Sequence, residues 1–384
     1  MNRRRLAFVF LTIPFAVYAW ACSSDSSETP AGNDAGTTPT STTPTPNPPP
    51  PTDPPPNPPP PPPPSDGGDA GNDAGPVTCV GNPLTFDGGT PDGGALIDAA
   101  AATMILNEGN GSFADGPQFY DYNGGALVFS QLYSNPPSLV RIQPDGGART
   151  VIRGTANGNQ FLIGNAVRDG GLLSTLSVVT PGNNGDAGIV TSNPAIVNND
   201  GGIVGIGAGN NPNDLAVGPK GDLYITDPQY QNNNAGTLAI YRVAPNGTVT
   251  QTTSTDRVNG IALSLDASKL FVSATNTKKV YSYPIAADGS ITNTPTTLVS
   301  ATADEPDGMA IDVGGNLWIA ESATNGGQSG RVEVFSPAGA KLGEIPFPTQ
   351  RPTGVAFGGA DNKTLFVTVE KGIYVFSSRC AGVR

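Results

Sequence analysis

The stretch NGIALSLDASKLFVSAT, residues 259–275, contains the unit that decides the fold. A polar residue and a small residue precede an alternating strand, Ile-Ala-Leu. A turn containing Asp follows, and a second strand, Leu-Phe-Val, comes after the turn. Period-2 alternation on both sides of such a turn is the signature of an antiparallel β-hairpin. We therefore predict a hairpin over these residues.

The same unit occurs in five other places along the chain. They are DGPQFYDYNGGALVFS (115–130), NQFLIGNAVRDGGLLSTLSV (159–178), NDLAVGPKGDLYITD (213–227), DGMAIDVGGNLWIAE (307–321) and TGVAFGGADNKTLFVTV (353–369). The six units begin at residues 115, 159, 213, 259, 307 and 353, so the intervals are 44, 54, 46, 48 and 46. That period matches a four-stranded blade. The sequence therefore predicts an all-β fold, a six-bladed β-propeller over residues 77–384.

Two other β architectures fit the repeat less well. A β-sandwich would not repeat its unit six times, and a β-helix rung is much shorter than these units. Only residues 95–106 show a short helical periodicity. One slot of the second strand holds a large apolar residue in most units, and this regularity predicts a core between blades. The residues in that slot are Val128, Tyr224, Phe271, Trp318 and Phe366.

The first 21 residues predict a signal peptide. Three arginines, at positions 3–5, precede an uncharged apolar segment over 6–21, which is short for a membrane span. The segment ends in Ala19-Trp20-Ala21-Cys22, which resembles a bacterial lipobox with Cys22 as the lipidated residue. An ordinary cleavable signal with an unrelated cysteine is the alternative. Serines after Cys22, in place of aspartate, favour an outer-membrane lipoprotein of the cell envelope, facing the periplasm or the cell surface.

Residues 22–76 predict a disordered tether that begins at the lipidated cysteine. They are rich in Pro, Thr, Ser, Gly and Asp and contain almost no apolar side chain, so they cannot bury a core. The run over 48–64 is nearly all proline and favours extended polyproline II. A tether of this kind would hold the folded domain away from the bilayer.

Charge and composition exclude several classes of function. The net charge is −12 and no basic cluster follows the signal, so nucleic acid is not an expected partner and the membrane is reached only through the lipid anchor. The chain has no histidine, which rules out a His-ligated zinc site and a Ser-His-Asp triad. We expect a monomer.

Two cysteines remain in the predicted folded region. Cys79 lies near its start and Cys380 near its end. An exported chain meets oxidising conditions, so a Cys79–Cys380 disulfide would join the first and last segments of the ring. Two free thiols are the alternative.

The residues that open the units suggest a metal site. The innermost strands of a propeller line its channel, and the six opening residues all carry oxygen: Asp115, Asn159, Asn213, Asn259, Asp307 and Thr353. Converging carboxylate and amide oxygens suit one hard divalent cation, Ca²⁺ most naturally, with Mg²⁺, Mn²⁺ or Zn²⁺ as alternatives. The competing interpretation is that Asn and Asp open these strands simply as turn residues.

Five of the quoted strings, in order, resemble the gluconolactonase family, which includes the senescence marker protein regucalcin. The resembling segments cover residues 212–230, 258–275, 306–321, 330–348 and 352–376, and the first third of the domain is less similar. The resemblance implies a six-bladed propeller with one divalent metal in its channel. It also implies hydrolysis of a small-molecule lactone or another ester.

The resemblance assigns roles to individual residues. The metal ligands fall on Asp115, Asn213, Asn259 and Asp307, with Asp115 replacing the family's usual glutamate. The family's substrate-binding arginine falls on Asn211, so sugar-acid recognition differs here. Asn159 opens the second unit and is expected, with Asn211, to face the substrate.

The chemistry that this site implies is metal-assisted hydrolysis. The metal would polarise the lactone carbonyl, and Asp307 would be both a ligand and the general base that takes a proton from water. Asp214 and Asp227 lie nearby in sequence, and Asp227 is interpreted as a turn residue. The missing arginine favours an alternative, a non-catalytic propeller that binds a ligand or a protein at its loop-rich face. An envelope spacer without any site is a third hypothesis.

Overall fold

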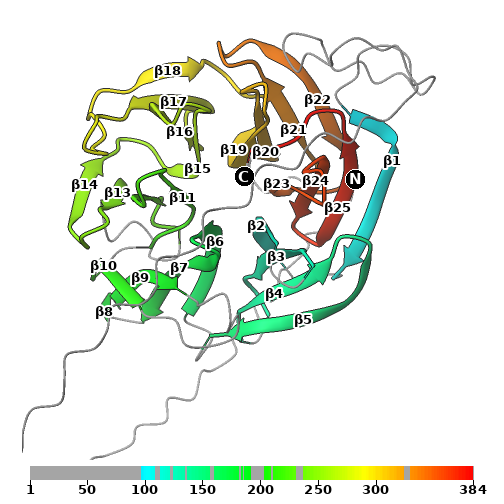
Figure 1. Ribbon diagram of the computed structural model, residues 1–384, viewed down its shortest axis with the longest axis horizontal. Coiled ribbons are helices and arrows are strands. Elements are labelled where there is room, and N and C mark those ends of the chain that lie inside the picture. The colour runs from blue at the N-terminus through cyan, green and yellow to red at the C-terminus, as the bar shows by residue number, and fades with distance from the viewer. Residues whose placement is uncertain are drawn as a thin grey trace, which may run out of the picture. The chain divides into compact units, whose positions relative to one another are not determined.

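In the computed structural model, the described part of the chain is built from β-strands (Figure 1). The description covers residues 97–383 except 109–112, 122–123, 135, 156–159, 181–182, 185, 192–202, 209–210, 231–236 and 324–328. The predicted signal peptide, Cys22, the tether and Cys79 lie outside it. Within it there is no helix, and hence no helix long and apolar enough to cross a membrane.

Five sheets are regular blades of four antiparallel strands. In each of these blades, neighbouring strands along the sheet are hydrogen-bonded to one another from the innermost strand to the outermost. Three contain β11 (Leu215–Val217) to β14 (Val249–Thr253), β15 (Val258–Leu263) to β18 (Thr296–Val299), and β19 (Glu305–Ile311) to β22 (Lys341–Phe347). Between them lie β12 (Leu223–Asp227), β13 (Ala239–Val243), β16 (Lys269–Ala274), β17 (Lys279–Pro284), β20 (Leu317–Ser322) and β21 (Gly330–Phe335).

The other two regular blades come from the beginning and the end of the described chain. One has β2 (Ala114–Tyr120), β3 (Ala126–Gln131), β4 (Ser138–Gln143) and β5 (Gly146–Gly154). The other has β23 (Pro352–Gly358), β24 (Thr364–Val369), β25 (Gly372–Ser378) and, outermost, β1 (Ile97–Asn107). These five sheets have the form that the repeat predicts.

The unit predicted to begin at Asn159 departs from that form. Its sheet has five strands, β6 (Gln160–Arg168), β7 (Gly171–Thr180), β9 (Asp186–Thr191) and β10 (Ile203–Ala208), with β8 (Asn183–Asn184) paired to β7 outside this order. The expectation of six four-stranded blades is therefore corrected to five. The physical reason is the longer segment after β7, which adds a two-residue strand.

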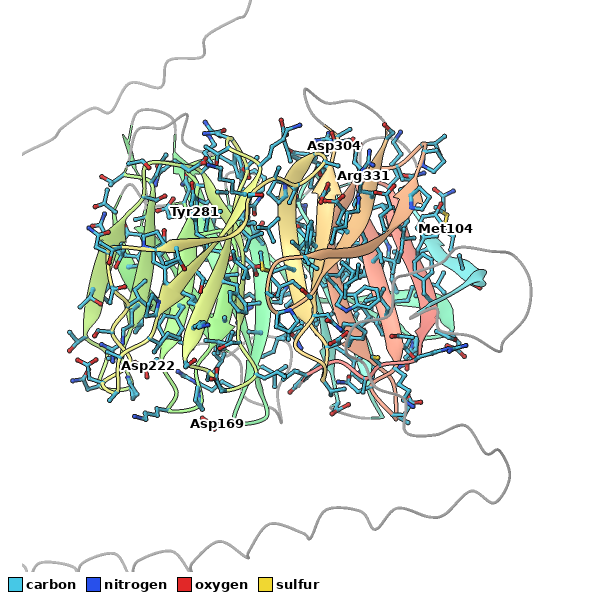
Figure 2. The ribbon with its side chains drawn as sticks, turned by 90° about the horizontal axis from the view of Figure 1, so that it is seen from above. Met104, Asp169, Asp222, Tyr281, Asp304 and Arg331 are labelled. Atoms are coloured by element: carbon cyan, nitrogen blue, oxygen red, sulfur yellow. The ribbon has the colours of Figure 1, made fainter. Side chains whose placement is uncertain are left out.

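The sheets are arranged around one axis, and one strand of each sheet is innermost (Figure 1). Strands β2, β6, β11, β15, β19 and β23 surround the centre, and the all-β, propeller-like prediction is confirmed. Seen from the side, Asp304 and Arg331 lie at one end of the axis and Asp169 and Asp222 at the other (Figure 2). The inner strands therefore begin near the end with Asp304 and Arg331, which we call the entry end. They finish near the end with Asp169 and Asp222, which we call the exit end.

Strand β1 joins the two ends of the described chain. It pairs antiparallel with β25, from Ile97 opposite Ser378 to Asn107 opposite Gly372 (Figure 1). The helical periodicity over 95–106 was a wrong indication, because this segment satisfies its backbone on the open edge of β25. A strand from the beginning of the domain therefore completes the last blade.

The core between blades lies where the sequence predicts it. Trp318, Phe366 and Val128 have no exposed surface, and Tyr224 and Phe271 are also buried. The ring of Trp318 in β20 meets that of Phe357 in β23 edge-on, with centroids 5.6 Å apart. Such contacts join neighbouring blades, so the large residue of the second strand stabilises the ring through burial of apolar surface.

Candidate functional site

Five of the six inner strands, all except β11, have a β-bulge near their entry ends. The pairing register with the second strand shifts between Asp115 and Gln118, Leu162 and Asn165, Val258 and Ile261, Pro306 and Met309, and Pro352 and Gly354. A bulge leaves residues unpaired and redirects their side chains. Asn259, Asp307 and Thr353, which open three of the repeated units, lie inside such bulges, and Asp115 lies at the edge of the first.

A glycine in each bulge allows the blades to touch. A Cβ on Gly116 would lie 2.0 Å from the Ile163 carbonyl oxygen, and a Cβ on Gly260 would lie 2.1 Å from that of Asp307. Gly164, Gly308 and Gly354 are similarly close to the next blade, at 2.5, 3.0 and 2.4 Å. Backbone therefore packs closely around the axis, and no side chain fits between neighbouring inner strands at these positions. We call these five positions, together with Asp214 in the blade of β11, the glycine ring.

The cavity along the axis brings together the four predicted metal ligands. It has a volume of about 620 Å³, and Asp115, Asn213, Asn259 and Asp307 all line it. The lining continues along the inner strands to their exit ends, where Val383 also contributes. The described structure thus places side chains from four blades in one space, as the repeat predicts.

The second unit differs from the others at the cavity. Asn159 lies outside the described residues, and Ile163 occupies the position before Gly164. Asn165, two residues further, lines the cavity, and its Nδ2 donates to the Gly116 carbonyl at 2.7 Å and to Ser130 Oγ at 3.1 Å. This blade therefore contributes an amide whose nitrogen is already used in packing.

Asn211, the second predicted substrate residue, does not line the cavity. It is fully buried, and its backbone nitrogen donates to Asp227 Oδ2 at 3.1 Å. Asp227 also accepts from the backbone nitrogen and Nε2 of Gln229, at 3.1 and 2.7 Å. The interpretation of Asp227 as a turn residue fits these contacts, and the Asn211 backbone is hydrogen-bonded to this turn from the segment before β11.

Asp214 is a cavity residue to which the sequence pattern assigned no role. It stands where the other blades have the ring glycine, and its carboxylate lines the cavity. Its Oδ1 accepts from Leu215 N at 2.9 Å and its Oδ2 from Ile261 N at 3.1 Å. The sequence repeat could have pointed to Asp214, because it is the single residue other than Gly at this position in the six inner strands.

Three carboxylates, one buried and two partly buried, share the cavity and disfavour one another's ionisation. The pKa of Asp115 is raised to about 7, chiefly by burial; a hydrogen bond from Gly116 N lowers it and the charge of the nearby Asp214 raises it. Burial also raises the pKa of Asp214 to about 7. The pKa of Asp307 lies well above its ordinary value, first from burial and then from the charges of Asp115 and Asp214. A cation would relieve this repulsion.

An amide oxygen at the same place has no donor. Asn259 Nδ2 donates to the hydroxyl of Tyr230 at 3.3 Å, and Asn259 Oδ1 is buried without a hydrogen-bond partner. In the described residues, no three His, Cys, Asp or Glu side chains are grouped closely enough to hold a metal ion. A cation here would therefore need amide as well as carboxylate oxygens, and the donor set fits a hard divalent ion.

The family of the chain follows from its sequence. A family model described as the SMP-30/gluconolactonase/LRE-like region matches residues 113–371, and the chain belongs to this family. The matched residues run from the start of β2 to the turn before β25, so they include all the cavity carboxylates.

Individual relatives match over shorter stretches. The chain is 30% identical over 164 residues to the pentonolactonase XacC of Haloferax volcanii, covering 42% of this chain and 53% of the relative. It is 38% identical over 116 residues to the 6-deoxy-6-sulfogluconolactonase of Pseudomonas putida, covering 29% and 37%. Regucalcin of Danio rerio is 30% identical over 164 residues, with 41% and 53% covered. The matches thus span about half or less of these relatives.

Solved structures share the fold. A gluconolactonase from Xanthomonas campestris has a TM-score of 0.59 and 24% identity, covering 72% of this chain and 89% of that one. A calcium-binding regucalcin from Agrobacterium tumefaciens has a TM-score of 0.57 and 20% identity, covering 73% and 95%. At these identities the likeness concerns the fold alone.

Proposed function

We propose that this protein is a metal-dependent lactone hydrolase. The observation that carries the proposal is the convergence of Asp115, Asn213, Asn259 and Asp307 on one cavity, with Asp214 beside them. Membership of a family that contains lactonases supports the same reaction class. The substrate class is a small-molecule lactone or a related ester.

The side chains in the cavity would have two roles, to bind a cation and to accept a proton from water. Asn259 Oδ1, Asp115, Asn213 and Asp307 would hold the divalent cation, which when bound supplies a Lewis acid for the lactone carbonyl. Ca²⁺ is the ion we favour, because the donors are hard oxygens and a family relative is calcium-binding. Asp307 is the proposed general base toward water, because burial and the neighbouring carboxylates raise its pKa well above the ordinary value of an aspartate.

A lactone panel with defined ions tests this function. Purified protein is freed of metal with a chelator and assayed with Ca²⁺, Mg²⁺, Mn²⁺ or Zn²⁺ on five- and six-membered sugar lactones. We expect turnover with at least one ion, and Asp307→Asn should lower kcat by about 10²-fold or more. Asp266→Asn, in the turn between β15 and β16, is the matched control and should keep full activity. Absence of turnover with every ion contradicts the proposed function.

A second function has one specific observation in its favour. The position of the family's substrate arginine holds Asn211, which is buried against Asp227 and does not line the cavity. A non-catalytic propeller that binds a ligand at its loop-rich face would tolerate this loss. Ion-dependent binding of sugar lactones without their hydrolysis would favour this function over catalysis.

We propose further that the five-stranded sheet acts as the remaining blade of a six-bladed ring. We also propose that the protein is exported, anchored through Cys22 and monomeric, on the basis of the lipobox-like segment and the tether composition. Mass spectrometry of the mature N-terminus and a Cys22→Ala variant test the anchor, because the variant should leave the membrane fraction.

A further inference from the structure

We infer that Tyr230 is a positioning residue that orients the Asn259 amide, so that Asn259 Oδ1 faces the cavity as a cation ligand. The inference deepens the proposed function and rests on it only for the presence of a divalent cation. Tyr230 follows β12 in the blade of β11, whereas Asn259 belongs to β15 in the next blade. Their hydrogen bond, 3.3 Å long, therefore crosses between two blades at the bulge.

The polarity of this bond settles which end of the amide enters the cavity. The Tyr230 hydroxyl also lies 2.9 Å from Thr275 Oγ1. A phenol hydroxyl has one proton and can accept as well. If it donates that proton to Thr275, it presents an acceptor to Asn259 and takes the Nδ2 hydrogen. Asn259 Oδ1 is then left on the opposite side, which is where it is buried without a donor.

The hydroxyl of Thr275 is in turn positioned by a hydrogen bond of its own. Its hydroxyl donates to the carbonyl oxygen of Pro306 at 3.3 Å, and Pro306 precedes Asp307 by one residue. The sequence of donors therefore runs from Asn259 to Tyr230, on to Thr275 and finally to the backbone beside Asp307. One chain of hydrogen bonds thus links the Asn259 amide to the backbone next to Asp307, a second proposed ligand.

The loop that carries Tyr230 is organised around Asp227. Gln229 has a φ of 57°, an uncommon conformation for a residue other than glycine, and it is fully buried. The Asp227 carboxylate accepts from both the backbone nitrogen and the side chain of Gln229, and so holds this conformation. On the other side, Arg257 lies 5.0 Å above the centre of the Tyr230 ring. The loop conformation and the Arg257 contact thus both restrict the Tyr230 ring, as a positioning residue requires.

Metal affinity, and not activity, is the direct measurement. Calorimetric titration of the chelator-treated full-length protein with Ca²⁺ and with Mn²⁺ gives the dissociation constant. Tyr230→Phe removes only the hydroxyl, and we expect a dissociation constant raised about 10-fold, the lower end of what outer partners of metal ligands contribute. Tyr224→Phe is the matched control. It removes a buried tyrosine hydroxyl from the blade that also carries Tyr230, one that donates to the Gly289 carbonyl of the next blade, and it should leave the affinity unchanged.

A second variant tests the direction of the bond. Thr275→Val removes the acceptor of the Tyr230 proton, so the hydroxyl becomes free to donate to Asn259 and to draw Oδ1 away from the cavity. We expect weaker Ca²⁺ binding for this variant also. A dissociation constant within twofold of the wild type in both Tyr230→Phe and Thr275→Val overturns the inference. Failure of the lactone assay alone contradicts the proposed function and leaves this inference standing, because the titration does not depend on turnover.

Discussion

Asp214 Oδ2 accepts a hydrogen bond from Ile261 N at 3.1 Å, and this bond joins the inner strands of two neighbouring blades. At the other blade contacts of the glycine ring, the closeness comes from glycine. Here a carboxylate takes the glycine's place and bonds to the adjacent strand. The same carboxylate lies near Asp115 and Asp307, so it couples the packing of the ring to the charge of the cavity.

Asp214→Asn should therefore change how its neighbours titrate. Removing the charge leaves burial as the main cause of the raised pKa values, so the pKa of Asp115 should fall from about 7 and that of Asp307 should fall too. The measurement is a pH titration of aspartate side-chain carboxyl signals by ¹³C NMR on metal-free protein. Asp266→Asn is the control, and an unchanged Asp115 midpoint in Asp214→Asn contradicts the coupling.

The glycine ring gives a prediction about stability. Gly260→Ala places a Cβ 2.1 Å from the Asp307 carbonyl oxygen, and this neighbour is backbone that cannot rotate away. We expect the free energy of unfolding to fall by about 1–3 kcal/mol, the usual range for overpacking.

A glycine without close neighbours serves as the control. It separates the effect of steric crowding on stability from the general effect of replacing glycine by alanine. A Cβ on Gly205 in β10 would meet no atom within 4 Å, so Gly205→Ala should be nearly neutral. Both variants are measured by urea unfolding. Equal midpoints for the two variants would show that the ring is not tightly packed.

The sequence predicted the blades well because their pattern is local. Alternation along a strand and turn residues between strands recur within each unit, so Trp318 and Phe366 could be assigned to the core from their shared slot. The four cavity residues Asp115, Asn213, Asn259 and Asp307 were found for the same reason, since each opens a repeated unit.

The features that were missed depend on contacts between distant segments. Residues 95–106 read as weakly helical because their partner, β25, lies at the other end of the domain. The contact of Asp214 with the next inner strand can be recognised only once the strands lie side by side. The role of Tyr230 likewise depends on the placement of its loop beside Asn259. In the second unit the register was misassigned, and Ile163 takes the position expected for Asn159.

Cys380 offers a prediction about how the domain is closed. It is fully buried and disulfide-bonded. We expect its partner to be Cys79, and reduction to lower the free energy of unfolding by about 2–5 kcal/mol. Peptide mass spectrometry without reduction checks the pairing, with a reduced and alkylated sample as the control. Alkylation of Cys79 in the native, unreduced protein would contradict it.

Glu321 gives the clearest prediction of pH dependence. Glu321 is fully buried in β20. Burial raises the pKa of Glu321 to about 10, together with a hydrogen bond to Glu333 and the negative charge of Glu333. Lys341 binds Glu333, so Glu333 keeps the negative charge while Glu321 keeps the proton. The folded protein therefore holds a proton that the unfolded chain releases above its ordinary pKa of 4.5. Stability from this proton is complete below that value and is lost as pH rises toward 10.

Glu321→Gln should remove this loss. The glutamine amide can still donate toward Glu333 but cannot ionise, so the variant should exceed the wild type in unfolding free energy by at least about 1 kcal/mol at pH 9 and be close to it at pH 5. Urea unfolding at both pH values is the measurement. Glu344→Gln is the control: Lys341 first of all lowers the pKa of Glu344, so its contribution is lost only as pH falls below the ordinary value of 4.5, and this variant should keep the wild-type loss between pH 5 and pH 9. A wild-type stability that rises between pH 5 and pH 9, with Glu321→Gln following it in parallel, would show that Glu321 is ionised in the folded protein.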